Sequence, residues 1–124
     1  MSFVSPEILS KLSSLTKTDA DDANFGIVKV DSNGRILLYN KYESELAGVP
    51  SSSAEGKNFF TELAPCTNNK LFFGKFKSGV EIGELNSLFN YTFTYKMKPT
   101  NVAIHLLHDK NTKTNWVFVQ KRIV

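Results

Sequence analysis

The sequence predicts an α+β domain, because a strand pair, a helical region and then three strands are expected in that order along the chain. Two patterns support this order. Asn33 and Gly34 stand between two apolar runs, which is typical of a tight hairpin. From residue 86 to residue 97 aromatic and polar residues alternate, as in a strand with one buried face. The 124 residues suffice for one domain with a sizeable core.

The first 24 residues are expected to form a short helical cap. Ile8, Leu9, Leu12 and Leu15 recur at helical spacing, and a polar stretch follows over 16–24. We therefore predict an N-terminal cap over 1–24 and a core over 25–124, within one domain overall.

Two strands, over 25–30 and 35–40, are expected on either side of the Asn-Gly turn. Short, weakly helical pieces should follow Asn40. A loop is expected over 50–53, where Pro50 and three serines favour turns. Cys66 falls in this irregular part of the chain.

A longer helix is predicted from about Asn69 to Ser78, because Leu71, Phe72 and Phe76 recur at helical spacing. Strands are then expected over 86–97, 102–108 and 115–119, with a polar turn between the last two. The odd positions of the first of these strands should form an aromatic wall facing inward: Phe89, Tyr91, Phe93, Tyr95 and Met97.

Composition narrows the possible functions. Lys and Arg total 15 against 12 Asp and Glu, and the basic residues are scattered, so nucleic-acid binding is not indicated. No apolar run approaches the roughly 20 residues of a membrane span. One cysteine and no export signal at the N-terminus favour a reducing cytoplasm. We expect a monomer whose signal, if any, passes to an unknown downstream signalling protein.

The single cysteine, Cys66, has no cysteine partner for an internal disulfide or a zinc site. Its useful chemistry is that of a nucleophile, since a thiolate can hold an acyl group as a thioester inside a suitable pocket. The alternative is a buried cysteine that packs as a small apolar residue.

Three segments together closely resemble the photoactive yellow protein family: 33–43, 56–67 with its Ala-Pro-Cys-Thr run, and 90–100. The resemblance extends from about Phe25 to the strand 116–119. It implies a PAS fold, which is a central five-stranded antiparallel sheet flanked by helices. It also implies a blue-light photoreceptor rather than an enzyme.

In this family the counterpart of Cys66 carries para-coumaric acid (4-hydroxycinnamic acid) as a thioester, and the backbone N–H of Cys66 would hold the thioester carbonyl. A buried phenolate needs strong hydrogen-bond donors, and Tyr39 and Glu43 match the family's two donors. Light-driven trans-cis isomerisation would be followed by proton transfer from Glu43, local unfolding as the signalling state, and recovery in the dark assisted by Met97. The resemblance implies a pocket of ten residues: Met97, Phe93, Tyr95, Phe59, Leu46, Ala64, Pro65, Thr67, Ala47 and Val49.

Two of these positions depart from the family pattern. Ala47 stands where the best-known members have a threonine that bonds the tyrosine, and Val49 stands where they have an arginine that covers the pocket. The hydrogen-bond chain should therefore be one link shorter, and we expect solvent access to the pocket to differ.

Two other functions compete with light sensing. One is a PAS module that binds another ligand or only a protein partner. The other is a thiol enzyme that uses Cys66 for acyl transfer, with His105 or His108 as its base. The two histidines lie three apart on a predicted strand, so they should face opposite sides and make a poor metal pair. We interpret His105 as a hydrogen-bonded structural histidine.

Overall fold

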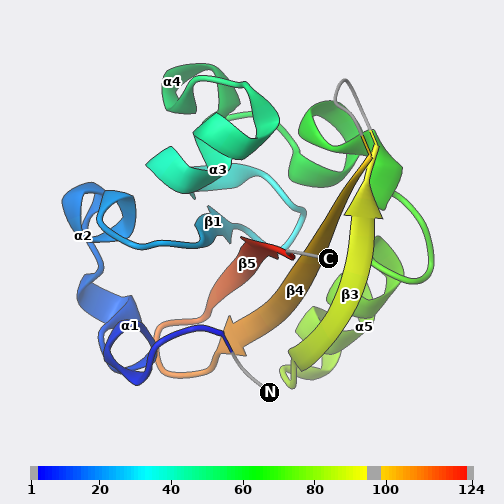
Figure 1. The fold of residues 1–124 in the computed structure, drawn as a ribbon. Coiled ribbons are helices and arrows are strands. Elements are labelled where there is room, and N and C mark those ends of the chain that lie inside the picture. The colour runs from blue at the N-terminus through cyan, green and yellow to red at the C-terminus, as the bar shows by residue number, and fades with distance from the viewer. Residues whose placement is uncertain (1–2, 95–98, 123–124) are drawn as a thin grey trace.

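A single antiparallel sheet organises the chain (Figure 1). The computed structural model describes residues 3–94 and 99–122. Its five strands lie in the order β2-β1-β5-β4-β3. Their bounds are Gly26–Val30 (β1), Ile36–Tyr39 (β2), Asn86–Phe93 (β3), Thr100–Asp109 (β4) and Thr114–Lys121 (β5). The predicted α+β class and five-stranded sheet are confirmed.

The predicted Asn-Gly hairpin joins β1 and β2. The Asp31 carboxylate accepts hydrogen bonds from the backbone N–H groups of Asn33 and Arg35, and Gly34 takes a φ of 93° that glycine adopts readily. The register pairs Val28 with Tyr39. Because side chains alternate along a strand, Tyr39 therefore lies on the same face of the sheet as Val28.

Strand β3 shows the predicted alternation. In β3, Phe89 and Tyr91 are half-buried and Phe93 is buried, whereas Asn90 and Thr92 are exposed. β4 and β5 extend by one or two residues beyond each predicted end. Tyr95 and Met97, which were assigned to the same strand as Phe93, lie outside the described residues.

Short helices fill most of the region between β2 and β3. They are α3 (Lys41–Ala47), α4 (Ser51–Ala54), a π-helical turn (Phe59–Leu63) and a 3-10 turn (Pro65–Thr67). The predicted loop over 50–53 is wrong in part, because Pro50 begins the single helical turn α4, with the backbone N–H groups of Ser53 and Ala54 donating to its carbonyl.

The longer helix α5 spans Phe73–Ile82, four residues later than predicted. The Asn69 side chain explains the late start, since its Oδ1 accepts from the backbone N–H groups of Leu71 and Phe72 and holds that stretch as a turn. Gly83 ends the helix at a φ of 69°. The apolar spacing thus identified the buried face of the helix and not its ends.

The N-terminal segment forms α1 (Pro6–Ser10), a 3-10 turn (Leu12–Ser14) and α2 (Lys17–Asp21), as Figure 1 shows in blue. Its apolar side chains pack with residues of one sheet face, and we call this group the cap-face cluster: Val4, Ile8, Leu12, Ala20, Phe25, Ile27, Trp116 and Phe118. A helical N-terminal segment is thus confirmed, while its division from the core at residue 24 stays a prediction.

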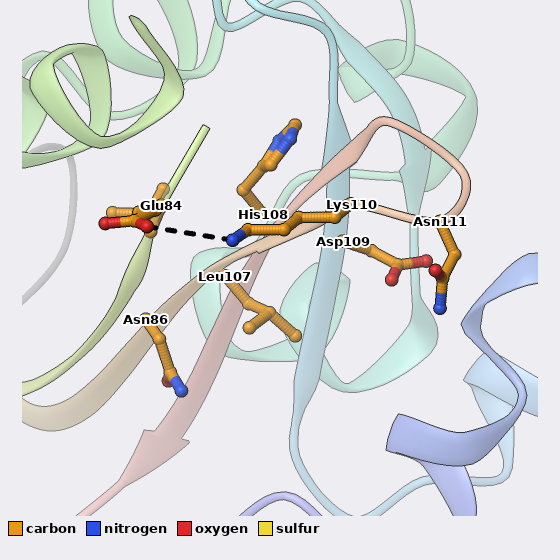
Figure 2. A pocket seen from close by; sticks show the side chains of 8 residues that line it. Glu84, Asn86, Leu107, His108, Asp109, Lys110 and Asn111 are labelled. Carbon is orange, nitrogen blue, oxygen red and sulfur yellow. Dashed lines mark ion pairs between the residues drawn. The ribbon is translucent and has the colours of Figure 1, made fainter. Parts of the chain in front are cut away.

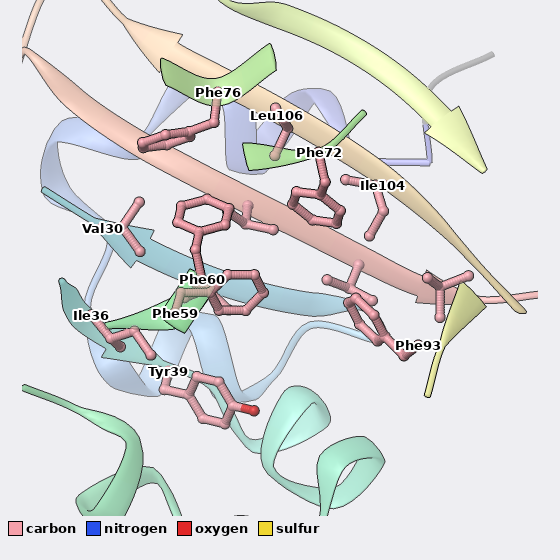
Figure 3. Packing of buried hydrophobic residues seen from close by; sticks show 14 of the residues in the cluster. Val30, Ile36, Tyr39, Phe59, Phe60, Phe72, Phe76, Phe93, Ile104 and Leu106 are labelled. Atoms are coloured by element: carbon pink, nitrogen blue, oxygen red, sulfur yellow. The ribbon is translucent and has the colours of Figure 1, made fainter. Parts of the chain in front are cut away.

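The opposite face of the sheet carries a larger group, which Figure 3 shows in part. Alternate residues of the same strands supply it, such as Val28, Val117 and Val119, while Phe60, Phe72 and Phe76 come from the helical side. We call this group the site-face cluster. Among the described residues, no helix combines the length and apolar character needed to cross a membrane.

Candidate functional site

Cys66 lies in the 3-10 turn Pro65–Thr67 as a free, partly buried cysteine that packs against the site-face cluster. The next residue, Thr67, is fully buried, and both its backbone N–H and its hydroxyl donate to the Ala64 carbonyl. These bonds close the turn tightly. The thiol therefore stands on a defined backbone beside an apolar interior.

Tyr39 and Glu43 come from adjacent elements, the end of β2 and the first turn of α3. Both are almost completely buried, with 1% and 2% of their surface exposed. Asn40, between them, is also buried, and its side chain accepts from the N–H groups of Ile27 and Glu43. Its amide donates to the carbonyls of Ala20 and Phe25. This network fixes the start of α3, and with it the position of Glu43.

One oxygen of the Glu43 carboxyl lacks a hydrogen-bond partner among the described residues. This oxygen, Oε1, is also buried. Loss of solvent raises the pKa of Glu43 to about 8, so the carboxyl is mostly protonated at pH 7. Burial, with the nearby Glu43 as a smaller cause, also raises the pKa of Tyr39. The site thus contains two neutral acids that can donate hydrogen bonds.

Gly26 on β1 makes room for the Glu43 carboxyl. A Cβ atom at this position would overlap Glu43 Oε1 and come within 3.1 Å of the Val119 side chain. Only a residue without a side chain fits here while Glu43 keeps its place. An isolated glycine within a predicted strand was the sequence signal for such a close approach, and we missed it.

The site-face cluster unites many of the predicted site residues. Tyr39, Phe59 and Phe93 are buried members of this cluster and are labelled in Figure 3. Four half-buried predicted residues pack against it: Leu46, Val49, Ala64 and Cys66.

Three other predicted pocket residues are not part of the site-face cluster. They are the half-buried Ala47 and Pro65 and the buried polar residue Thr67. Tyr95 and Met97 fall outside the described residues.

Two residues that sequence reasoning did not assign to the site contact the cysteine backbone. The Tyr91 hydroxyl donates to the Cys66 carbonyl at 2.5 Å, and the Asn69 amide donates to the same oxygen at 3.1 Å. Tyr91 was predicted only as a core aromatic. An asparagine at the start of a predicted helix was a recognisable capping signal, but its contact with Cys66 depends on the tertiary fold.

The histidines lie elsewhere. His105 is buried, packs edge-to-face on Phe118 of the cap-face cluster, and pairs through Nε2 with Asn86 Oδ1 at 2.6 Å. The prediction of a hydrogen-bonded structural histidine is confirmed. His108 pairs through Nδ1 with Asn115 Oδ1 at 2.7 Å. In the part of the chain that the structure describes, no three His, Cys, Asp or Glu side chains gather as a metal site.

A separate cavity of about 600 Å³ lies near the β4–β5 turn (Figure 2). Glu84 and Lys110 pair across it at 3.8 Å, and both side chains are largely exposed. The described lining includes His108 but neither Cys66, Tyr39 nor Glu43. This cavity therefore lies outside the candidate site.

No family model matches the chain. Individual relatives, however, show which family it belongs to. The chain is 38% identical to the photoactive yellow protein of Rhodothalassium salexigens over 119 residues, which cover 96% of this chain and 95% of that protein. It is also 38% identical to the photoactive yellow protein of Rhodobacter capsulatus over 102 residues, which cover 82% of each chain.

Solved structures agree with this result. The photoactive yellow protein domain of the sensor histidine kinase Ppr from Rhodospirillum centenum superposes with a TM-score of 0.85 at 36% identity, covering 90% of this chain and 98% of that one. The PAS domain of the quorum-sensing receptor RpfR from Cronobacter turicensis superposes with a TM-score of 0.67 at 16% identity, covering 82% and 97%, and supports the fold alone. The chain therefore has a PAS fold and belongs to the photoactive yellow protein family of blue-light photoreceptors.

Proposed function

We propose that this protein senses blue light through 4-hydroxycinnamic acid (para-coumaric acid) held as a thioester on Cys66. The observation that supports this most strongly is the pair formed by Tyr39 and Glu43, which are buried on the same side of the sheet as Cys66, with one carboxyl oxygen of Glu43 lacking a partner among the described residues. An unsatisfied buried donor is costly unless a ligand satisfies it. A phenolate oxygen would accept the hydrogen bonds that these two groups offer.

The residues present fit this ligand in three respects. A single thiol on a closed turn supplies the attachment point. Aromatic and aliphatic side chains beside it suit a flat, largely apolar molecule. A protonated Glu43 and the Tyr39 hydroxyl suit its oxygen, because hydrogen bonds to a charged acceptor are stronger than those between neutral groups. The bound group supplies absorption of blue light and isomerisation about its double bond.

The remaining steps belong to the chain's own residues. Glu43 stores a proton in the dark and, after illumination, passes it from its carboxyl to the phenolate oxygen. One O–H bond breaks as the other forms, and a carboxylate remains buried on the site face. An unpaired buried charge is strongly unfavourable, so its appearance drives local loosening of the surrounding structure.

Other residues tune this cycle. The backbone N–H of Cys66 holds the thioester carbonyl, and Met97 assists recovery in the dark. We also assign to the pocket Phe59, Phe93, Tyr95, Leu46, Ala64, Pro65 and Thr67. Ala47 offers no hydroxyl to Tyr39, and Val49 leaves the pocket without a charged cover, so these two positions adjust colour and recovery rate.

The N-terminal cap is the part most ready to detach, because its helical pieces span only three to five residues each. Its release would expose the apolar cap face to a downstream signalling protein. A sensor histidine kinase carries the related domain from Rhodospirillum centenum, which supports a signalling role for the partner. We place the protein in the cytoplasm, where a reducing environment keeps Cys66 available, and assign it sensing rather than enzymatic turnover.

An absorption spectrum tests the proposal. Purified apoprotein is incubated with activated 4-hydroxycinnamic acid, and its spectrum is recorded before and after blue illumination, with Cys66→Ala as the control. We expect a band in the blue that requires Cys66, bleaches in light and returns in darkness. Attachment without a reversible, red-shifted band would show that Tyr39 and Glu43 do not hold a phenolate. No attachment would favour a PAS module for another ligand or partner.

A further inference from the structure

The carbonyl oxygen of Cys66 is held by two side chains from distant parts of the sequence. Tyr91 comes from β3 and donates through its hydroxyl at 2.5 Å. Asn69 comes from the turn before α5 and donates through Nδ2 at 3.1 Å. A carbonyl oxygen has two lone pairs, so these two donors satisfy it completely.

The two donors also bond each other. Asn69 Nδ2 lies 2.6 Å from the Tyr91 hydroxyl oxygen, which accepts one amide hydrogen while its own hydrogen points to Cys66. The same amide nitrogen also lies 3.1 Å from the Cys66 carbonyl oxygen. The three groups therefore form a closed triangle of hydrogen-bond contacts.

Packing and capping contacts hold both donors in place. Asn69 Oδ1 accepts from the backbone N–H groups of Leu71 and Phe72. The Tyr91 ring meets the fully buried Phe72 ring edge-to-face, with 5.1 Å between centroids. Tyr91 also pairs with Val102 in the central sheet. The Cys66 carbonyl is thus tied to a sheet strand and to the start of α5 by one rigid group.

We propose that Tyr91 and Asn69 are positioning residues that fix the peptide plane of Cys66, and so make the thioester end of the bound chromophore a stationary pivot. This inference rests on the proposed attachment at Cys66. With a fixed Cys66 peptide, rotation of the backbone at the attachment point cannot absorb the motion of isomerisation. With a loose peptide, part of that motion would be lost in backbone rotation, and the fraction of absorbed photons that produces the switched state would fall.

Because Cys66 is the only cysteine, cysteine labelled with ¹³C at its carbonyl marks one peptide group in the whole protein. The infrared band of that carbonyl reports its hydrogen bonds directly. The measurement is made on the apoprotein of wild type, Tyr91→Phe and Asn69→Ser. Tyr91→Phe keeps the ring that packs on Phe72, and Asn69→Ser keeps a side chain that can cap α5 while losing the reach to Cys66. We expect the labelled band to move to higher frequency in both variants.

The same variants are then loaded with activated 4-hydroxycinnamic acid, attachment is checked by mass, and the fraction switched per absorbed photon is measured. We expect Tyr91→Phe to lower this fraction by about twofold or more, and Asn69→Ser to lower it in the same direction. The absorption maximum should move little, because the contacts with Tyr39 and Glu43 remain.

Matched controls separate positioning from general stability. Thr92→Val removes one exposed hydrogen bond, from Thr92 to Asn101, in the same strand, and Asn68→Ser changes the exposed neighbour of Asn69. Neither should move the labelled band or the switching yield. If the wild type fails to attach the acid, the proposed function falls and this inference with it. If attachment is normal, an unshifted band or an unchanged yield in both Tyr91→Phe and Asn69→Ser overturns the inference alone.

Discussion

The two faces of the sheet are both apolar, yet the site face buries acids and the cap face buries a base. On the site face, Glu43 is an acid whose pKa is raised to about 8 by burial. On the cap face, His105 is a base whose pKa is lowered by burial, and its Nδ1 has no partner among the described residues. Both groups are therefore neutral at pH 7. Charging the site face requires base or a proton acceptor, whereas charging the cap face requires acid.

The covering layers differ as well. On the site face, α5 is ten residues long, with Asn69 and Gly83 defining its ends. On the cap face, the helical pieces have only three to five residues, too few to be stable without the sheet. The cap-face layer therefore depends on its packing against the sheet, whereas the site-face layer includes one longer helix beside the short pieces that carry Glu43 and Cys66.

The largest effect is expected at Glu43. Its pKa in the folded protein, about 8, lies above the ordinary value of 4.5, so the unfolded chain loses this proton more readily. Stability should be greatest below about pH 4.5, as far as this group is concerned, and should fall as pH rises toward 8. The full difference corresponds to roughly 5 kcal/mol as an upper value.

Urea unfolding of the apoprotein at pH 5 and pH 9 measures this slope. Glu43→Gln should remove most of the loss between the two pH values, while Glu45→Gln, an exposed position on the same helix, should keep it. Equal slopes in wild type and Glu43→Gln would contradict the burial of a protonated carboxyl.

A smaller loss is expected from filling the space beside Glu43. Gly26→Ala places a methyl group against the Glu43 carboxyl and Val119, and such overpacking costs about 1–3 kcal/mol. Gly74→Ala is the matched control, since a Cβ there meets only ordinary contacts at 3.6 Å and sits in helix α5. Thermal or urea unfolding compares the two. A Gly26→Ala variant as stable as wild type would show that Glu43 and Val119 can shift to accept the methyl group at little cost.

Acid should lower the stability of the folded protein through His105 on the cap face. The pKa of His105 in the folded protein is below its ordinary value of 6.5, so the unfolded chain takes up this proton first. The contribution to stability is present above about pH 6.5 and is lost as pH falls below it. Trp116, the single tryptophan, belongs to the cap-face cluster and reports the change by fluorescence.

His105→Leu should reduce the acid sensitivity of the Trp116 signal between pH 7 and pH 5. His108→Asn, which changes the other histidine, should preserve it. Retained sensitivity in His105→Leu would assign the acid response to another group and weaken the contrast between the faces.

The smallest effect is expected at the start of α2. Thr16 and Asp19 form a capping box there, and Thr16→Ala should cost about 1 kcal/mol. Hydrogen exchange of the α2 amides should accelerate, while amides of β4 should not. Thr18→Ala, exposed within the same helix, is the control. Faster exchange in β4 as well would mean that the cap and the sheet open together.

Much of this protein was predictable from local patterns. The Asn-Gly turn, the alternation in β3 and the spacing of apolar residues in α5 depend on neighbours a few positions away, and each predicted the correct element. Element ends were predicted less well, because side chains such as Asn69 compete with the helix for backbone N–H groups. The family resemblance of the segments around Tyr39, Glu43 and Cys66 is also a property of the sequence.

Only the tertiary structure decided the environment of those residues. Burial determines whether Glu43 is an exposed carboxylate or a neutral donor, and that burial depends on Gly26, which precedes Glu43 by 17 positions in the sequence but lies beside its carboxyl. The bonds from Tyr91 and Asn69 to the Cys66 carbonyl likewise join segments that no local pattern relates. Short-range periodicity is therefore enough to predict the elements, and the family resemblance is enough to name the candidate residues. The packing of the sheet decided their charge and orientation, because desolvation and hydrogen bonding depend on which distant residues meet.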